Sequence, residues 1–330
     1  MDKFLFFLKR FIPAPIFNFL QPIYHWKLAL LAAIFYGFPS KSMKVVGITG
    51  TSGKTTTIEF LHAIFAAEGF KTASLSGLRF KILDKEEPNL LKMTTPGRLR
   101  IQKFLRDAKN AGAEYVFLEV TSEGIKQSRH KFIKFYAAIF TNLSEEHIEA
   151  HGGFENYRAA KGELFKNIPL AILNGNDPNF EYFYKIAPKE KIVFTEGDYP
   201  KGLALKIPGS FNKMNAVAAI SFALREGVRL DVAKEALESV PGIPGRMEYL
   251  DTKKDFKVLV DYAFIPKVLG KVYKEAGPNL ICVLGATGGG RDKWKRPILG
   301  DVAHEFCRKV IVTNEDPYDE DPMKIMDEVS

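Results

Sequence analysis

Hydrophobic and polar positions along this chain follow two alternating patterns. Short apolar runs, typical of buried strands, are followed by longer stretches with apolar residues three and four apart, typical of helices on a sheet. The strand-like runs are 43–46, 115–120, 137–141, 170–174, 191–194, 257–261, 280–284 and 309–313. The helix-like stretches are 58–68, 99–111, 156–165, 212–226, 232–240 and 297–306. This alternation predicts an α/β fold in which parallel sheets are covered by helices.

A loop rich in glycine and threonine, residues 47–57, connects the first strand to the first helix. Glycines allow backbone N–H groups to turn toward a phosphate, and the N-terminus of the following helix adds a positive field. In such loops the lysine reaches the β- and γ-phosphates and the next hydroxyl binds Mg²⁺. The candidate nucleotide-binding residues are Gly50, Thr51, Ser52, Gly53, Lys54, Thr55 and Thr56. We expect this chain to bind ATP.

Three further side chains with chemical potential follow predicted strands or lie on a predicted helix. Glu119 ends the buried strand 115–120, His147 comes soon after the strand 137–141, and Lys161 lies within the helix 156–165. Ligands of open α/β sheets bind at the carboxyl ends of the strands. Spacing alone allows Glu119 and His147 to hold a metal near the phosphates, and equally allows a structural ion pair and a surface histidine.

Length and composition indicate an intracellular enzyme of more than one domain. The chain has 330 residues, of which 46% are hydrophobic, and a net charge of +8. That charge suits a phosphate-rich small substrate, and no basic–aromatic motif of nucleic-acid recognition is present. Cys282 and Cys307 lie in apolar surroundings without metal-ligand spacing. We expect them to be reduced thiols in the core, outside any disulfide framework.

The segment Pro241–Gly245 is dense in helix and strand breakers and predicts a linker. A second series of strands and helices follows it. We therefore expect an apolar and aromatic N-terminal segment at 1–41, a central ATP-binding domain at 42–242 and a C-terminal domain at 243–330.

The N-terminal segment differs in character from the rest of the chain. Pro13, Pro15 and Pro22 interrupt its pattern, and residues 28–38 are nearly all apolar. This core is shorter than the roughly 20 residues that a membrane-spanning helix needs. Two interpretations stay open: a segment lying in the membrane interface, or a pair of helices packed on the catalytic domain. The first implies peripheral membrane contact through residues 1–40 and a cytoplasmic protein at the inner face of the membrane.

Several motifs in fixed order resemble those of the Mur ligases, the ATP-dependent amide-forming enzymes of peptidoglycan synthesis. The resemblance runs from about Val45 to the end and is closest to the UDP-N-acetylmuramoyl-tripeptide synthetase branch. The matching segments are 47–57, 94–96, 118–122, 140–152, 157–165, 209–216, 245–248, 261–264 and 289–297. The resemblance implies a P-loop central domain with a parallel sheet, followed by a Rossmann-like C-terminal domain.

The resemblance also implies roles for single residues. Lys54, Glu119, His147 and Lys161 would be catalytic, and Lys161 would carry a carbamate. Thr55, Glu119, His147 and carbamylated Lys161 would hold two Mg²⁺ ions. The nucleotide would further contact Asn212, Asn215, Arg246 and Asp261. The substrates, a UDP-MurNAc-peptide-like acceptor and a free amino acid, would contact Thr94, Thr95, Ser122, Arg291 and Asp316.

The chain departs from the family pattern at several places. The family's N-terminal uridine-binding domain has no counterpart, and the C-terminal domain is expected to be incomplete because the chain stops at Ser330. Glu123 and Phe264 replace usual histidines. The amino-acid selector, which contains an arginine in diaminopimelate-adding enzymes, ends here in Tyr318, which cannot form a bidentate ion pair. The identity of the added amino acid therefore stays open.

The function predicted on this basis is ATP-dependent ligation of an amino acid to a UDP-MurNAc-dipeptide-like acceptor through an acyl phosphate. Three alternatives remain: a related ligase of another polymer or of folylpolyglutamate, a non-catalytic ATP-binding protein on the same scaffold, and an unrelated ATPase or kinase. The segments 94–96 and 291–297 argue against the folate enzyme.

Overall fold

A central eight-stranded sheet organises most of the chain. The computed structural model describes residues 14–91 and 93–330. The strand order is β4-β3-β2-β5-β1-β6-β7-β8, and all neighbours are parallel except at β3 and β4, which add antiparallel strands at one edge. The strands are β1 (Lys44–Thr49), β2 (Thr72–Leu75), β3 (Arg79–Ile82), β4 (Lys85–Pro88), β5 (Tyr115–Glu119), β6 (Phe135–Phe140), β7 (Leu170–Asn174) and β8 (Glu190–Phe194).

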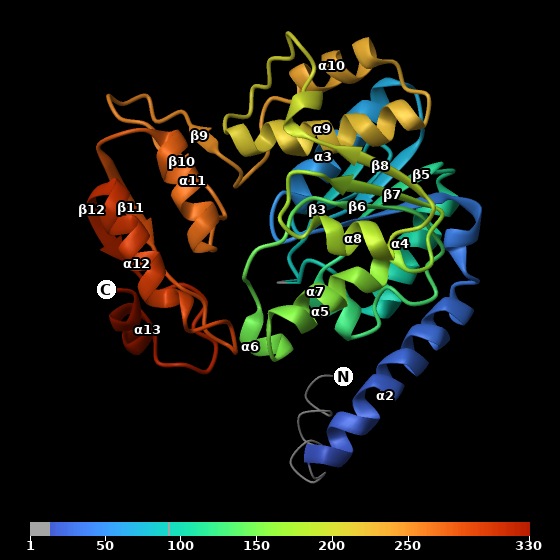
Figure 1. Cartoon of the computed structure of the whole chain (residues 1–330), viewed down its shortest axis with the longest axis horizontal. Helices are drawn as coiled ribbons and strands as arrows, with labels where there is room; N and C mark the ends of the chain where they lie inside the picture. Colours follow the sequence, from blue (N-terminus) through green and yellow to red (C-terminus); the bar gives the residue numbers. More distant parts are fainter. Residues whose placement is uncertain (1–13, 92) are drawn as a thin grey trace.

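Helices cover both faces of this sheet (Figure 1). One core lies between the sheet and α3 (Lys54–Ala67), α9 (Ser210–Arg225) and α10 (Leu230–Ser239). The other lies under α4 (Arg98–Asn110), α7 (Phe154–Gly162) and α8 (Phe180–Ile186). The central strands are buried on both faces, which explains their nearly continuous apolar runs. Short helices complete this body: η1 (Pro39–Ser42), α5 (Ser122–Lys126), α6 (Ile148–His151), η2 (Glu163–Phe165) and η3 (Glu196–Asp198).

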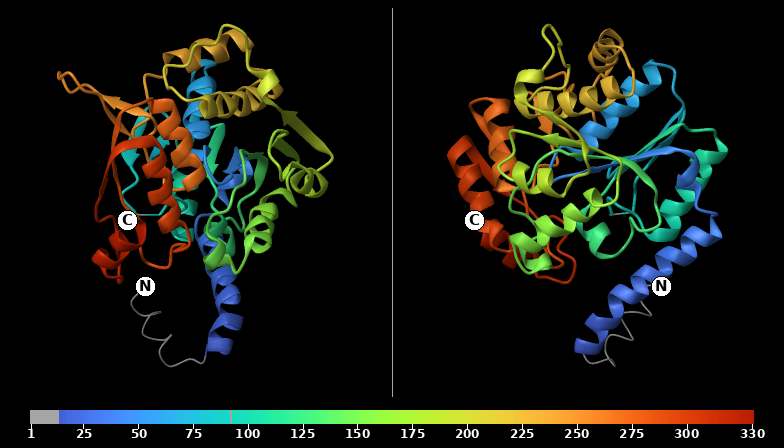
Figure 2. Two further views of the ribbon diagram at one scale, coloured as in Figure 1. Left: turned by 60° about the vertical axis from the view of Figure 1, so that its left-hand side comes forward. Right: turned by 45° about the vertical axis from the view of Figure 1, so that its right-hand side comes forward.

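A smaller C-terminal body lies beside the sheet, next to α6 (Figures 1 and 2). It begins with an antiparallel pair, β9 (Glu248–Leu250) and β10 (Val258–Val260), and continues with the parallel pair β11 (Leu280–Leu284) and β12 (Cys307–Val312). Its helices are α11 (Pro266–Ala276), α12 (Lys295–Phe306) and α13 (Pro322–Val329). Their apolar faces and the two parallel strands form a small separate core.

The structure confirms the predicted fold class. The predicted strands 170–174 and 280–284 have the observed bounds, and the other predicted elements differ by a few residues at their ends. The predicted linker Pro241–Gly245 lies between α10 and β9 and contains neither helix nor regular strand. Several elements have no predicted counterpart, among them β2, β3, β4, α8, β9, α11 and α13. Strands β3 and β4 are rich in charged residues because they form the solvated edge of the sheet, so they lack an apolar run.

The expectation of two reduced cysteines is wrong in this structure. Cys282 on β11 and Cys307 on β12 form a disulfide, with Cα atoms 6.0 Å apart. The two residues are separated by 25 positions in the chain, and the parallel pairing of β11 with β12 brings them together. Sequence spacing cannot show this proximity, because it depends on which strands become neighbours.

The N-terminal segment forms one long helix, α2 (Ala14–Phe35), that projects from the body (Figure 1). The prediction that Pro22 interrupts regular structure is wrong, since α2 runs through it and gives up one intrahelical hydrogen bond. Residues 1–13, which include Pro13, lie outside the described residues. No helix within 14–91 and 93–330 combines the length and apolar character needed to cross a bilayer.

Helix α2 combines features of both open interpretations. Its Ala29, Ala32 and Ala33 are buried, and the helix packs against α4. Apolar side chains elsewhere on α2 are exposed to solvent. These are Leu20, Ile23, Trp26, Leu31, Ile34 and Phe35. Packing therefore explains how α2 is attached, with the Trp26 ring 5.2 Å from the ring of Phe132. It does not account for the exposure of Leu31 and Phe35, which lie one turn apart on α2.

Histidines in the interior make stability depend on pH. Burial, reinforced by the positive charge of Lys81, lowers the pKa of His62 to about 4, and its Nδ1 lies 3.1 Å from the hydroxyl of Thr72. In the unfolded chain this pKa is about 6.5. The unfolded state therefore binds the proton first as pH falls, so the stabilisation is complete above about pH 6.5 and is lost toward about pH 4.

We expect His62→Gln to weaken this acid sensitivity by about 1–3 kcal/mol, because glutamine keeps a polar partner for Thr72 and does not titrate. Urea unfolding at about pH 7.5 and about pH 5 measures the difference. His304→Gln, at an exposed position on α12, is the control and should leave the pH dependence unchanged. An unaltered pH dependence in His62→Gln would contradict the assignment.

Candidate active site

The loop between β1 and α3 is held by close backbone contacts that admit only glycine at two points. Gly50 and Gly53 have φ of +153° and +80°. A Cβ on Gly50 would lie 2.0 Å from the hydroxyl oxygen of Thr141, and a Cβ on Gly53 would lie 2.2 Å from the amide oxygen of Asn215. The residue after β6 and a residue of α9 therefore lie so close to the loop backbone that only glycine fits at these two positions. Its backbone forms the predicted cradle for phosphate.

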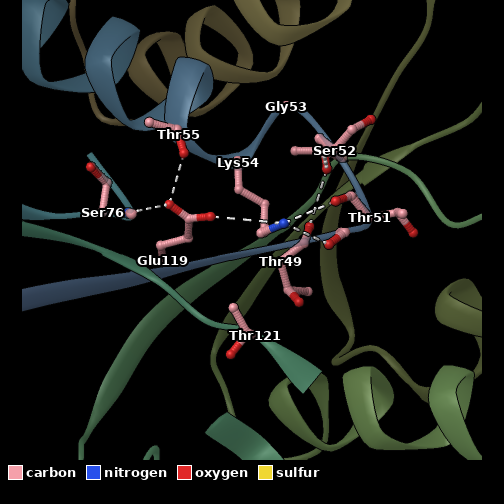
Figure 3. A network of polar contacts seen from close by, with 12 residues as sticks. Thr49, Thr51, Ser52, Gly53, Lys54, Thr55, Ser76, Glu119 and Thr121 are labelled. Carbon is pink, nitrogen blue, oxygen red and sulfur yellow. Dashed lines mark hydrogen bonds and ion pairs between the residues drawn. The ribbon is translucent and has the colours of Figure 1, made fainter. Parts of the chain in front are cut away.

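Lys54, Thr55 and Glu119 meet at the mouth of this loop (Figure 3). Thr55 Oγ1 donates to Glu119 Oε2 at 2.9 Å, and the amide of Gly77 donates to the same oxygen at 2.9 Å. Lys54 Nζ donates to the carbonyls of Gly50 and Thr51 and lies 3.8 Å from Glu119 Oε1. Burial lowers the pKa of Lys54, and the Glu119 carboxylate opposes that shift. A cation, a hydroxyl and a carboxylate are therefore fixed at the start of α3.

Lys161, on α7, contacts the same loop. Its side chain is 2% exposed and its Nζ donates to the carbonyl of Gly50 at 2.7 Å. Burial, followed by the positive charge of Lys54, holds the pKa of Lys161 well below its usual range. A buried amine beside another ammonium is easily left neutral, and a neutral amine is nucleophilic. Lys161 is therefore not a solvated helix residue, although its position within a helix is compatible with one.

His147 lies at the N-terminus of α6 in the left-handed region, with φ of +57°. Burial, then the positive charges of Arg291, Lys161, Lys295 and Lys54, lower the pKa of His147 to about 3. The imidazole is therefore neutral near pH 7 and retains a nitrogen lone pair for a metal or a proton. Arg291, the first of these charges, belongs to the C-terminal body.

The predicted contacts of the acceptor surround the end of β5. Thr95 Oγ1 donates to the carbonyl of Glu119 at 2.9 Å and accepts from the amide of Thr121 at 3.1 Å. Ser122 is buried, and its hydroxyl lies 3.2 Å from Nε2 of His151. Thr94 is half-buried, with its side chain next to Gly77. These residues line the strand end beside Glu119, and their roles toward substrate stay predictions.

The other predicted nucleotide contacts also lie around the loop. Asn212 and Asn215 on α9 are buried and joined by a 3.1 Å hydrogen bond. Arg246 Nη2 donates to Thr55 Oγ1 at 3.4 Å, which links the segment before β9 to the phosphate loop. Asp261 accepts from the amides of Met247 and Ala263 at 2.7 and 2.8 Å and thereby fixes the backbone beside Arg246.

Asp316, another predicted substrate contact, belongs to the C-terminal body. It is exposed beyond β12, and its carbonyl accepts from the amide of Gly288 at 2.9 Å. Tyr318, in place of the selector arginine, is exposed with φ of +55°.

Sequence reasoning missed the residues that hold the two bodies together. Lys295 Nζ bonds Glu146 Oε1 at 2.7 Å, and both side chains are buried, at 6% and 2% exposure. Asp292 accepts from the amides of Ile148 and Glu149 at 3.1 and 3.0 Å. We call Glu146–Lys295 together with these Asp292 contacts the interdomain clasp. The position of Glu146 directly before His147 could have drawn attention to it. Its pairing with Lys295 could not be predicted, because the two residues are far apart in the sequence.

The cluster suits magnesium only in combination with the phosphate loop. Within residues 14–91 and 93–330, no three histidine, cysteine, aspartate or glutamate side chains converge as a metal site by themselves. Thr55 and Glu119 present oxygens, which Mg²⁺ prefers, and this ion commonly completes its shell with substrate phosphates and waters. Neutral His147 adds a further potential ligand. The residues fit an ion that arrives with a nucleotide.

Comparison with known proteins decides the family. The family model described as Mur ligase middle domain matches residues 48–199, and the model described as Mur ligase, glutamate ligase domain matches residues 245–330. The chain belongs to the Mur ligase family. This confirms the resemblance seen in the sequence. It also confirms the predicted class of enzyme, an ATP-dependent acid–amino-acid ligase.

Named members of the Mur ligase family align with most of the chain. A UDP-N-acetylmuramoyl-L-alanyl-D-glutamate–2,6-diaminopimelate ligase of Syntrophomonas wolfei is 37% identical over 92% of this chain and 68% of its own length. A UDP-N-acetylmuramyl-tripeptide synthetase of Roseiflexus is 35% identical over the same shares. The chain thus spans about two thirds of the length of these relatives.

Solved structures agree on the fold. A diaminopimelate ligase structure has a TM-score of 0.61 and 27% identity, covering 87% of this chain and 65% of that one. A Mycobacterium tuberculosis folylpolyglutamate synthase, solved with ADP and AMPPCP, has a TM-score of 0.70 and covers 87% of this chain and 78% of its own. At 17% identity the latter shows a shared fold alone.

Proposed function

We propose that this chain forms an amide bond between the carboxylate of a UDP-MurNAc-peptide-like acceptor and the amine of an amino acid, using ATP. The observation that carries the proposal is the convergence of Lys54, Thr55, Glu119 and Lys161 on the phosphate loop. A carboxylate oxygen attacks the γ-phosphorus, ADP leaves, and an acyl phosphate forms. The amine then attacks the acyl carbon, and inorganic phosphate leaves as the nitrogen loses its proton.

The chain's own residues account for the electrostatic part of this reaction. Lys54 would offset negative charge on the transferred phosphoryl group, which is the main demand of phosphoryl transfer. Arg246 and Asp261 would orient the nucleotide from the C-terminal side. Mg²⁺, held by Thr55 and Glu119 with His147 and Lys161 near a second ion, would supply further charge neutralisation.

Carbamylation of Lys161 is part of the proposal. A neutral Lys161 amine adds to CO₂ and releases one proton, which gives an N-carboxylate. The lowered pKa of Lys161 supports this step, because only the unprotonated amine reacts. The product would convert the amine into an anionic oxygen ligand beside Gly50, where a metal–phosphate complex needs negative charge.

The test is ADP release by the protein with ATP, Mg²⁺ and UDP-MurNAc-L-Ala-D-Glu, with and without a panel of amino acids. We expect release that depends on one amino acid, with a matching mass gain on the acceptor. ATP binding without stimulation by any amino acid would contradict this function and favour either another acceptor or a binding protein on the same scaffold.

We further propose that the exposed side of α2 rests on an anionic membrane surface. Leu31 and Phe35 are exposed there, one turn apart, and Lys27 lies one turn before Leu31, a combination typical of interfacial helices. Cosedimentation with phosphatidylglycerol vesicles should fall more than about tenfold in Leu31→Glu/Phe35→Glu. Leu224→Glu, an exposed leucine on α9, should bind as the unchanged protein does, and equal binding by all three would refute the proposal.

A further inference from the structure

The disulfide between Cys282 and Cys307 joins the two parallel strands of the C-terminal body. Within the described chain, β11 and β12 form a two-stranded sheet of their own. A sheet of two strands is marginally stable without further support. The support here is a small core between these strands and α11, α12 and α13, against which Cys307, Val310 and Val312 pack. We therefore expect the position of β12 to depend on the covalent bond.

The same bond closes a ring that contains the C-terminal side of the interdomain clasp. Residues 283–306 lie between the two cysteines, and they include Asp292 and Lys295. Helix α12 runs from Lys295 to the residue before Cys307, so one of its ends carries the clasp and the other meets the disulfide. Because a helix moves as a rigid element, a shift at Cys307 would be felt at Lys295.

Cys307 is the more accessible end of the disulfide. Cys282 is buried, at 5% exposure, whereas Cys307 is partly exposed at the start of β12. Within four positions of Cys307 the sequence has two exposed cations, Arg308 and Lys309, and one acid, Glu305. Neighbouring cations stabilise a cysteine thiolate and attract an anionic thiol. The site therefore suits reaction with a small thiol that carries carboxylates, such as glutathione.

We propose that the Cys282–Cys307 disulfide is a thiol-responsive switch that controls the docking of the C-terminal body and, with it, the release of ADP. The disulfide keeps the clasp segment in place, and reduction releases it. The Mur ligase family is ATP-dependent. Because ATP and reducing thiols occur together inside cells, disulfides of ATP-dependent enzymes are usually transient or redox-sensing. The part that concerns ADP release rests on the proposed ligase function.

The reaction is a thiol–disulfide exchange in two steps. A small thiolate attacks Sγ of Cys307, the bond to Cys282 breaks, and Cys282 leaves as a thiolate that takes up a proton. A second small thiolate attacks the small-molecule sulfur of the mixed disulfide, and Cys307 leaves as a thiolate that is also protonated. Two electrons thus pass to the protein from two small thiols, which leave as one small disulfide. Oxidised glutathione reverses both steps.

The first test follows the oxidised full chain in mixtures of reduced and oxidised glutathione. Maleimide labelling and mass spectrometry count the free thiols, and the chain has two cysteines. We expect both to become labelled together as the reduced fraction rises. The first thermal transition should fall by about 5 °C or more, and the radius of gyration in solution X-ray scattering should increase. Oxidised glutathione should restore all three measurements.

Two results of this titration would overturn the switch. One is the absence of labelling in excess reduced glutathione. The other is complete labelling with an unchanged thermal transition and an unchanged radius of gyration.

Cys282→Ala/Cys307→Ala mimics the reduced chain. It should show the lower thermal transition at every glutathione ratio, and a dependence on glutathione that persists in this variant would refute the switch. If the variant does not fold, the reversible reduction of the unchanged chain still decides.

Arg308→Gln/Lys309→Gln tests the attraction of an anionic thiol. Removal of both cations should slow reduction by glutathione about fivefold at low salt, and should change reduction by uncharged 2-mercaptoethanol less than about twofold. Lys185→Gln/Lys189→Gln removes two exposed lysines from the central body and is the matched control. Equal rates of reduction by glutathione in the two variants would refute the local role of Arg308 and Lys309.

The outcomes also distinguish this inference from the ligase proposal, because labelling, unfolding and scattering need no turnover. Amino-acid-dependent ADP release that is the same before and after reduction would preserve the ligase and refute the switch. A chain that expands on reduction and releases no ADP in either state would preserve the control of docking and refute the ligase.

Discussion

Lys161→Ala is expected to lower the rate of amino-acid-dependent ADP release about a hundredfold to a thousandfold. The side chain is buried against the phosphate loop, and its Nζ bonds the Gly50 carbonyl at 2.7 Å. Its removal deletes both the carbamate and the group that would hold the second ion. Added short carboxylates such as acetate or formate should restore part of the rate, because alanine leaves room for them beside Gly50. Steady-state rates with and without these acids measure the effect.

Lys166→Ala is the matched control. Lys166 follows shortly after α7, is exposed, and pairs with Glu163 at the surface, so its loss should leave turnover unchanged. Turnover of Lys161→Ala equal to that of the unchanged protein would remove Lys161 from the mechanism. A loss without rescue, at unchanged melting temperature, would remove the carbamate and leave Lys161 with a role in shaping the loop.

Glu146→Gln or Lys295→Met is expected to separate the two bodies. Each change leaves the other charge buried without its partner, which typically costs about 3–5 kcal/mol. Burial already raises the pKa of Glu146, and Lys295 opposes that shift. Either change therefore makes docking of the C-terminal body on the central body less favourable. Solution X-ray scattering should show a larger radius of gyration, and the rate of ADP release should fall.

The double variant Glu146→Gln/Lys295→Met sharpens the test. It removes both buried charges at once, so it should dock better than either single variant. Glu190→Gln breaks the exposed pair with Arg225 and should change nothing measurable. A double variant as open as the singles would show that the interdomain clasp depends on Asp292 and its amide contacts, and not on the buried pair.

Local pattern was enough to predict the fold class and the phosphate loop. Alternating apolar runs and helical spacing describe how a segment meets a sheet, so they located β5, β7 and α4 to within a residue or two. The same pattern missed β3 and β4, whose charged residues face water at the sheet edge. It also missed the disulfide, which requires knowing that β11 and β12 are neighbours.

The site was predictable where residues lie near the loop in sequence or match a family motif. Thr55 and Glu119 do meet, as expected from two adjacent parallel strands whose carboxyl ends share one edge. The burial of Lys161 and the pairing of Glu146 with Lys295 were not predictable, because both depend on contacts between segments far apart in the chain. The proposed roles of these charged residues depend on their neighbours in three dimensions, which residue type alone does not reveal.

The guanidinium of Arg296 makes the position of α13 matter to the boundary between the two bodies. Arg296 is 1% exposed and bonds Glu328 on α13 at 2.6 Å and Glu320 before it at 3.1 Å. Undocking of α13 would leave this buried cation at the start of α12 without its carboxylate partners. The disturbance would begin one residue from Lys295 and two from Trp294. A change at α13 would therefore reach the interdomain clasp long before it reached the central sheet.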